Sequence, residues 1–310
     1  MAPMTKPLCP VTGEPAVRLV QWVGARFLAF LWKTTMRTNA RPSFGGVERF
    51  GLWESPTGLY FFDPPTVGDH EFYTGFYNCL LERKLWRTDA RRQEFVEAAR
   101  RVKPGDRVLD VGCGFASFRY SVPHASYTGL DPNFAGHSKP EHVRDELLQD
   151  HLKAHAGVYD MVCAFAVVEH VENPVTLFTE MVQAARPGGL VIVSVPHVPS
   201  APMRIPNFLI NAPPHHLTWW TRSALAALAA RCSTEVEAID TMGWDQADSL
   251  MYWIERCSLI RCKDRYYSKS PLWLSSEVVG YLGGRILHAL KGVPTRQDEG
   301  SSLMLVARRP

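Results

Sequence analysis

The stretch that decides the fold is RVLDVGCG, Arg107–Gly114. It follows a turn signal at Lys103–Asp106. The run from Val108 to Val111 is short, apolar and rich in β-branched residues, which predicts a buried parallel strand. Two glycines then allow a tight turn and a close approach to a ligand, because neither carries a Cβ. We expect a helix to open at Phe115–Tyr120, with its first amide groups facing that ligand.

Further strands follow this one in an order that can be read from apolar runs and turns. The predicted strands are Tyr127–Asp131, His142–Arg144, Tyr159–Phe165, Leu190–Pro196, Cys232–Asp240 and Ser301–Ala307. Asp131 ends the first of these, 17 residues beyond Gly114. A carboxylate at that place can accept two ribose hydroxyls through its two oxygens.

As an ordered set, these segments resemble the class I S-adenosylmethionine-dependent methyltransferases. The resemblance covers roughly residues 90–243 and the last strand. It implies an α/β, doubly wound, Rossmann-like sheet that is mostly parallel and has an antiparallel last strand. Ala116 departs from the family pattern, which usually has glycine at this third small position. A nicotinamide-binding loop would instead need glycine at Ser117.

The resemblance implies S-adenosylmethionine as the cofactor. An acid after the third strand would approach the adenine amino group, and Glu146 is preferred to Asp145 for this role. The residues expected to bind the cofactor are Asp110, Gly112, Cys113, Gly114, Asp131, Pro132, Glu146, Ala164, Phe165 and Ala166.

A hydroxyl acceptor would have to lose a proton, and a histidine suits that task near neutral pH. The candidates are His216, His215 and His170, and an ordinary imidazole would titrate at about pH 6–7. Because His215 and His216 are adjacent, we expect them to point to different sides, so that one reaches the site. The residues expected to contact the acceptor are Tyr73, Tyr77, Glu169 and Trp219, with Trp220 as a further wall.

Two short motifs raise the question of a metal ion, and we expect none at either. Some RNA-end and quinone methyltransferases carry Glu-x-x-Glu-His with a magnesium ion at the turn of Glu169-His170. Here Ala166 replaces the first glutamate, which leaves few ligands for a hard cation. At Cys9–Gly13 a threonine, Thr12, stands where a zinc knuckle would have its second cysteine.

The domain organisation predicted from these motifs has two parts. Residues 1–87 form an N-terminal extension that caps the cofactor and substrate, and residues 88–310 form the cofactor-binding domain, with a helical insertion at 245–295. We expect a helix at Leu19–Arg37, a hairpin within Phe44–Pro65 and a helix that begins at Thr88-Asp89. The basic amphipathic segment 19–37 packs on its own domain or makes a peripheral membrane contact.

Composition narrows the class of protein. The chain of 310 residues has 46% hydrophobic and 21% charged residues and a net charge of +3, which is too mild to indicate a nucleic-acid partner. Its seven cysteines are scattered without a Cys-x-x-Cys pair, which favours a reducing, cytoplasmic location. No run is long and apolar enough for a membrane span.

The predicted function is S-adenosylmethionine-dependent methyl transfer to a small-molecule acceptor, with O-methylation favoured. Two alternatives stay open. One is a binding or scaffold protein that keeps the fold without turnover, and the other is a nucleic-acid methyltransferase. The sequence does not fix the oligomeric state.

Overall fold

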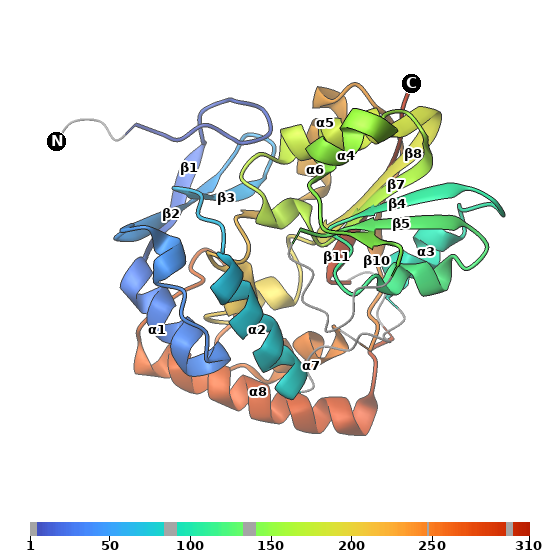
Figure 1. Cartoon of the computed structure of the whole chain (residues 1–310). Coiled ribbons are helices and arrows are strands. Elements are labelled where there is room, and N and C mark those ends of the chain that lie inside the picture. Colours follow the sequence, from blue (N-terminus) through green and yellow to red (C-terminus); the bar gives the residue numbers. More distant parts are fainter. Residues whose placement is uncertain (1–4, 84–91, 133–140, 247, 296–299) are drawn as a thin grey trace.

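The computed structural model describes residues 5–83, 92–132, 141–246, 248–295 and 300–310, and its strands form two sheets (Figure 1). A seven-stranded sheet has the order β10-β11-β8-β7-β4-β5-β6, and a four-stranded sheet has the order β1-β2-β3-β9. We call the first the core sheet and the second the N-terminal sheet.

The core sheet confirms the predicted fold class. Its strands are β4 (Arg107–Val111), β5 (Ser126–Leu130), β6 (Val143–Arg144), β7 (Tyr159–Phe165), β8 (Ala185–Pro196), β10 (Glu235–Met242) and β11 (Ser302–Arg308). The pairs β4–β5, β4–β7, β5–β6 and β7–β8 are parallel. The last strand, β11, runs antiparallel between β8 and β10, as expected.

Helices cover both faces of the core sheet because successive side chains of a strand point to opposite sides. The helices involved are α3 (Gln93–Ala99), α4 (Leu148–His155), α5 (Pro174–Ala184) and α6 (Arg222–Arg231). Leu109 of β4 packs in the cluster that includes Phe178 of α5 and Leu225 of α6. Its neighbour Val108 packs on the other face, with Phe95 of α3.

The segment after β4 differs from the prediction. No α-helix forms at Phe115–Tyr120, and Ser117–Ser121 is a short 3-10 helix. It begins after Ala116, which has φ +54° in the left-handed region, and it cannot continue because Val122 precedes a proline. A ligand at the end of β4 would therefore meet the amide groups of the glycine loop and not those of a long helix.

The N-terminal sheet joins residues from both sides of the predicted domain boundary. Its strands are β1 (Arg18–Gly24), β2 (Arg49–Glu54), β3 (Tyr60–Asp63) and β9 (Thr218–Trp219). β2 and β3 form the expected hairpin. β9, which begins two residues after His216, adds to this sheet beside β3. The loop that carries the histidines is thus fixed to the N-terminal extension.

The prediction of one helix over Leu19–Arg37 is wrong in its first part. Arg18–Gly24 pairs with β2, and α1 spans only Ala25–Met36. The apolar side of α1, with Leu28, Leu31 and Trp32, is buried in the core next to the N-terminal sheet. The apolar side that might have met a membrane is therefore used for packing within the protein.

One helix of the N-terminal extension begins with a side-chain cap. Asp69 caps α2 (His70–Glu82), since its carboxylate accepts a hydrogen bond from the Phe72 N–H at 2.8 Å. The predicted helix start at Thr88-Asp89 lies outside the described residues. Among the helices that the structure describes, none combines the length and the apolar character needed to cross a membrane.

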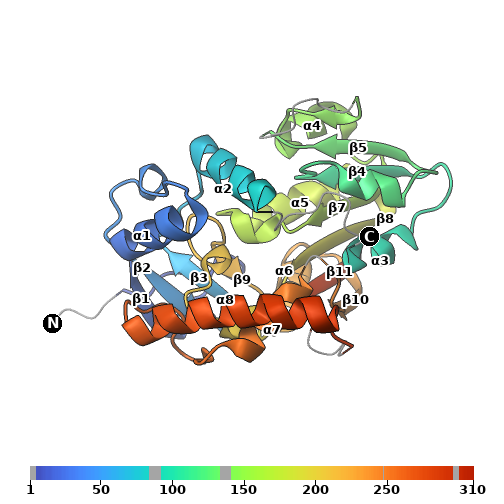
Figure 2. The ribbon, with the colours of Figure 1, turned by 90° about the horizontal axis from the view of Figure 1, so that it is seen from below.

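The predicted insertion contains two helices, α7 (Ser249–Cys257) and α8 (Pro271–Lys291). Figure 2 shows α8 running beneath the molecule, from the side of the N-terminal sheet to the side of the core sheet. The two helices approach closely at small residues. A Cβ on Gly284 would lie 2.7 Å from the backbone of Ile254.

The contact between α7 and α8 can be tested by filling the space at Gly284. Gly284→Leu should lower the free energy of unfolding by at least about 1–3 kcal/mol, because the new side chain must push the helices apart. Urea denaturation measures this loss. Ala289→Leu, on the exposed side of the same helix, is the matched control. Equal stability of the two variants would contradict the described packing.

Candidate functional site

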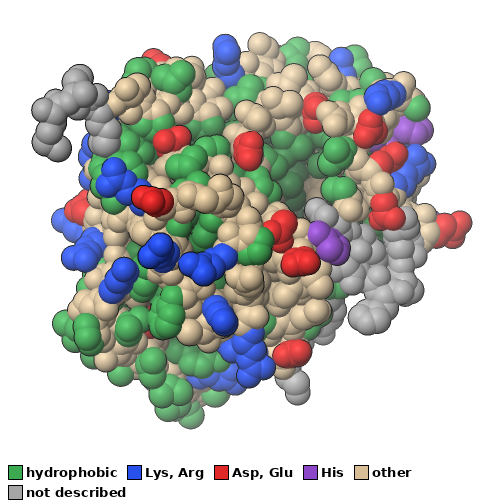
Figure 3. Space-filling model, turned by 60° about the vertical axis from the view of Figure 1, so that its left-hand side comes forward, with side chains coloured by type: hydrophobic (Ala, Val, Ile, Leu, Met, Phe, Trp, Pro, Cys, Tyr) green, Lys and Arg blue, Asp and Glu red, His purple; other side chains and the backbone are tan. Residues whose placement is uncertain are grey.

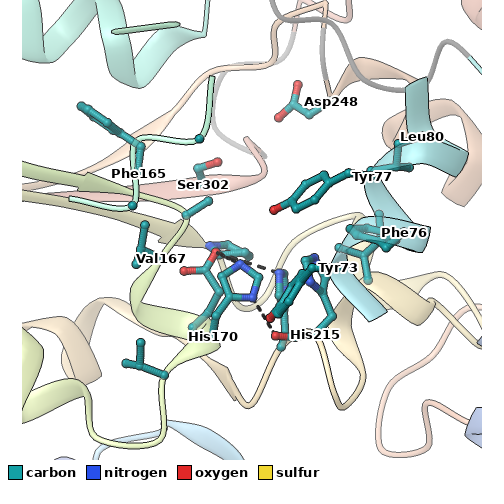
Figure 4. A pocket seen from close by; sticks show the side chains of 18 of the residues that line it. Tyr73, Phe76, Tyr77, Leu80, Phe165, Val167, His170, His215, Asp248 and Ser302 are labelled. Atoms are coloured by element: carbon teal, nitrogen blue, oxygen red, sulfur yellow. Dashed lines mark hydrogen bonds and ion pairs between the residues drawn. The ribbon is translucent and has the colours of Figure 1, made fainter. Parts of the chain in front are cut away.

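A large cavity lies where the parallel strands of the core sheet end (Figure 4). Its volume is about 1380 Å³, and its walls come from the core sheet, α2, α7, α8 and the loops between them. Ligand pockets commonly measure about 300–1,000 Å³. The cavity is thus large enough for two ligands side by side.

The glycine loop and the end of β5 form one end of this cavity. Gly112, Cys113, Gly114, Asp131 and Pro132 all line it. Their contact with the cofactor stays a prediction. The Gly114 N–H donates to Asp131 Oδ2 at 2.9 Å, which ties the loop to the carboxylate. We call this part the cofactor end.

Gly112 is required for a reason that the sequence did not show. It has φ +67°, and a Cβ there would lie 2.6 Å from Cγ2 of Val167 in the turn after β7. The glycine therefore lets two strand ends approach each other at the floor of the cavity.

Two acids at the cofactor end have protein partners. Asp110 accepts a hydrogen bond from the Tyr127 hydroxyl at 2.6 Å, and burial raises the pKa of Asp110 to about 7. Glu146 lies 2.7 Å from Nδ1 of His151 and 3.7 Å from Arg144. Both acids line the cavity.

The predicted cofactor residues at the end of β7 and directly after it divide into two groups. Phe165 and Ala166 line the cavity. Ala164 does not; it is fully buried in the core below the cavity, on the face that meets α5. The prediction for Ala164 is wrong because alternate residues of a strand face opposite sides.

Three histidines meet on one wall of the cavity (Figure 4). The ring centroids of His170 and His215 are 4.4 Å apart, those of His170 and His216 are 4.7 Å apart, and those of His215 and His216 are 4.6 Å apart. The prediction that His215 and His216 point to different sides is wrong. They lie in a turn, where both backbone N–H groups donate to the Ala212 carbonyl, and not in an extended strand.

Hydrogen bonds hold two of these rings by the same nitrogen. Nδ1 of His170 lies 2.6 Å from the carbonyl oxygen of His215, and Nδ1 of His216 lies 3.1 Å from Oδ1 of Asn211. A carbonyl oxygen only accepts, so each Nδ1 carries the proton. The Nε2 atom of each neutral ring then has a free lone pair.

Glu169 lies among these rings. Its Oε1 is 3.9 Å from Nε2 of His170 and 4.0 Å from Nε2 of His216. Its side chain is fully buried, and in the described part of the chain neither carboxylate oxygen has a hydrogen-bond partner. Burial without such partners raises the pKa of Glu169 to about 8.

Burial acts on the histidines in the opposite direction. It lowers the pKa of His170 to about 4, and it lowers the pKa of His215 and of His216 well below the ordinary value. The predicted titration at about pH 6–7 is therefore corrected downward. At neutral pH the rings are uncharged, which is the form of imidazole that accepts a proton, and the same burial makes each ring a weaker base.

The same arrangement could hold a metal ion. One nitrogen from each of His170, His215 and His216 lies within 4.8 Å of the others. Histidines that bind metals usually donate their second N–H to a carbonyl or carboxylate, as His170 and His216 do here. Such a set would suit a transition metal better than magnesium. The geometry thus admits a proton acceptor or a cation at this place.

Both predicted tyrosines reach the cavity from α2. Figure 4 shows Tyr73 beside the histidines and the ring of Tyr77 directed into the open space. The ring of Tyr73 lies 5.9 Å from that of His215. Burial raises the pKa of Tyr77 to about 12, so its hydroxyl stays protonated. We call this region, with the histidines and Glu169, the acceptor end.

Trp219 does not contact the cavity, which corrects its predicted role. It belongs to β9, and pairing with β3 turns its ring into the N-terminal core, against Phe62 and Tyr266. Its Nε1–H donates to the Asn211 carbonyl at 2.8 Å. Trp220 is also buried, in the core near α6. Trp219 supports the histidine loop from behind.

The sequence analysis missed several polar residues of the cavity, among them Asp248, Ser302 and Glu277. Asp248 and Ser302 lie across the cavity from the histidines (Figure 4), and Glu277 enters from α8. Burial raises the pKa of Asp248 to about 8 and that of Glu277 to about 7. The sequence could have indicated Glu277, because it is the one acidic residue within α8.

Comparisons with known proteins agree on one class. Residues 84–237 match the family model described as "Methyltransferase domain". The ubiquinone biosynthesis O-methyltransferase of Escherichia coli (strain K12 / DH10B) is 33% identical over 102 residues, which is 29% of this chain and 42% of that protein. The match thus spans less than half the length of this curated relative.

Two solved structures are similar to this chain at lower sequence identity. A SAM-dependent methyltransferase from Archaeoglobus fulgidus is 16% identical, with a TM-score of 0.48, over 75% of this chain and 99% of that one. The geranyl diphosphate C-methyltransferase of Streptomyces coelicolor A3(2) is 17% identical, with a TM-score of 0.43, over 70% of this chain and 75% of that one.

The role expected for Asp131 can be tested by calorimetry. Asp131→Ala should weaken S-adenosylmethionine binding by about 2–3 kcal/mol, because the ribose hydroxyls lose a charged acceptor. Asp240→Ala, at an exposed position of β10, is the control and should bind as the wild type does. If a folded Asp131→Ala variant keeps the wild-type affinity, Asp131 does not hold the ribose.

Proposed function

Because the chain belongs to the class I S-adenosylmethionine-dependent methyltransferases, we propose that it transfers the methyl group to a hydroxyl oxygen of a small-molecule acceptor. The observation that carries this proposal is the group of uncharged histidines at the acceptor end, in the same cavity as the glycine loop. A neutral imidazole in this place suits an acceptor that must give up a proton.

The reaction needs alignment and one proton transfer. The acceptor oxygen attacks the methyl carbon in line with the carbon–sulfur bond, which breaks as the carbon–oxygen bond forms. The sulfonium becomes the neutral thioether of S-adenosylhomocysteine, and the hydroxyl proton passes to a histidine. The donor is already activated by its positive sulfur, so the protein supplies orientation and excludes water.

His216 is the histidine we propose as the base. Asn211 holds its Nδ1, so Nε2 presents the lone pair. Glu169 lies 4.0 Å from that Nε2 and is mostly protonated at neutral pH, because burial raises its pKa to about 8, so it places no negative charge beside the base. His170 is also held through its Nδ1, by the His215 carbonyl. His215 lines the same wall of the cavity. These two are the alternatives to His216.

The walls of the acceptor end suit an aromatic or apolar hydroxyl compound. Tyr73, Phe76, Tyr77 and Leu80 present one side of α2 to the cavity. A hydroxyl acceptor also fits the similarity to an O-methyltransferase, which covers 42% of that relative. We propose that Tyr73 and Tyr77 contact the acceptor directly.

The function is tested with methyl-labelled S-adenosylmethionine and matched acceptor pairs, such as an alkyl catechol and the aniline of the same shape. Mass spectrometry locates the label. The proposal expects an O-methyl ether from the catechol. Transfer to the aniline alone, or no transfer by protein that binds the donor, would contradict it.

The proposed base is tested with His216→Gln in the same assay. The variant should lower kcat by about 10²–10⁴ and leave donor affinity unchanged, because glutamine accepts no proton. Since burial lowers the pKa of His216, the wild-type rate should not fall between pH 8.5 and 5.5 through loss of the neutral base. His70→Gln, exposed at the start of α2, is the control.

Treatment with a chelator distinguishes two hypotheses, in which the histidines either act as a free base or bind a metal ion. Enzyme dialysed against a chelator should keep its turnover if His216 is a free base. Loss of turnover that a divalent transition metal restores would show that the histidines hold a cation instead. Full turnover by His216→Gln would remove this residue from the reaction.

A further inference from the structure

Helix α8 buries its small residues and exposes its large apolar ones, which is the reverse of the usual distribution. Its buried positions are the small residues Ser276, Gly280 and Gly284, which face α7. Its large apolar residues are exposed, with Ile286 at 61% and Leu290 at 77%. The residues of this exposed apolar stripe are Leu272, Val278, Val279, Leu282, Ile286 and Leu290.

The stripe runs the length of the helix. Leu272, Val279, Leu282, Ile286 and Leu290 follow each other at intervals of seven, three, four and four residues, which places them on one side. A helix of 21 residues is about 31 Å long. A continuous apolar surface of this length is unusual on a protein that only meets water.

Basic residues are frequent in the segment that carries the stripe. Residues 259–293 contain six Lys or Arg and two Asp or Glu, whereas the whole chain has a net charge of only +3. The basic residues are Arg261, Lys263, Arg265, Lys269, Arg285 and Lys291. Of the two acids, Glu277 faces the cavity. The apolar stripe thus lies within a positively charged segment.

The basic surface continues onto α1. Nζ of Lys269 lies 5.9 Å from the ring centroid of Phe27, so the start of α8 lies against that helix. Arg26, Phe30 and Lys33 form the exposed side of α1. Figure 3 shows hydrophobic side chains along the lower edge of the molecule, where α8 runs, and Lys and Arg side chains above them.

The stripe also meets the cavity. Val278 and Leu282 belong to the stripe and line the cavity as well, next to Tyr281. A surface on which α8 rests would therefore touch the rim of the site.

We propose that the outer side of α8 docks on an anionic lipid membrane, with the stripe in the headgroup region and the Lys and Arg side chains on lipid phosphates. Apolar residues on one side and basic residues beside them are the pattern of helices that lie in the membrane interface. A symmetric contact between two copies of the chain is less suitable, because it would bring two sets of positive charges together.

The test is co-sedimentation of the full-length protein with vesicles, which needs no enzyme turnover. Vesicles of phosphatidylglycerol and phosphatidylcholine in equal parts should bind the protein at least about tenfold more tightly than pure phosphatidylcholine, and salt should weaken binding. Failure here would leave the proposed methyl transfer untouched, since the two are measured separately.

Two double variants identify the surface. Ile286→Asp/Leu290→Asp and Arg285→Glu/Lys291→Glu should each weaken binding to the anionic vesicles at least about tenfold. Leu8→Asp/Val236→Asp, at exposed apolar positions far from α8 in the sequence, is the control and should bind as the wild type does. Thermal unfolding confirms that each variant is folded.

Three results would overturn the proposal. The first is that the wild type sediments with neither kind of vesicle, and the second is that both α8 variants bind as tightly as the control. The third is a dimer, detected by light scattering, that Ile286→Asp/Leu290→Asp converts to monomers. In that case a second copy of the chain covers the stripe.

Discussion

The backbone of Leu217 joins the two sheets, and the acceptor end depends on this connection. Its N–H donates to the Glu169 carbonyl at 2.8 Å, and its own carbonyl accepts from the Phe62 N–H at 2.9 Å. Glu169 lies in the turn after β7, and Phe62 lies in β3. One residue thus fixes the histidine loop between the core sheet and the N-terminal sheet.

Other hydrogen bonds keep the same loop in place. The Trp32 Nε1–H donates to the Pro213 carbonyl at 2.9 Å, and the Gly68 N–H donates to the Pro214 carbonyl at 3.0 Å. The N-terminal extension, which was predicted to cap the cofactor, therefore also has a structural role. It holds the loop from which two of the three histidines reach the cavity, and burial in this setting keeps their rings uncharged.

Much of the fold could be predicted because each core strand is a local signal. The glycine loop, Asp131 and the antiparallel last strand were predicted from short runs, turns and a family resemblance, and the structure has them in those places. Trp219 and the pair His215-His216 were misplaced. Their directions depend on β9, a two-residue strand whose pairing with β3 joins positions more than 150 residues apart. Asp248 was missed because only the tertiary fold brings it to the cavity.

The central claim is that burial keeps the histidines of the acceptor end neutral, so that they can accept a proton. The most direct test is an NMR titration of protein labelled in its histidine rings, with His170→Gln, His215→Gln and His216→Gln to assign the signals. We predict that these three rings remain neutral from pH 8.5 to 5.5. Protonation of these rings within that pH range would contradict the account.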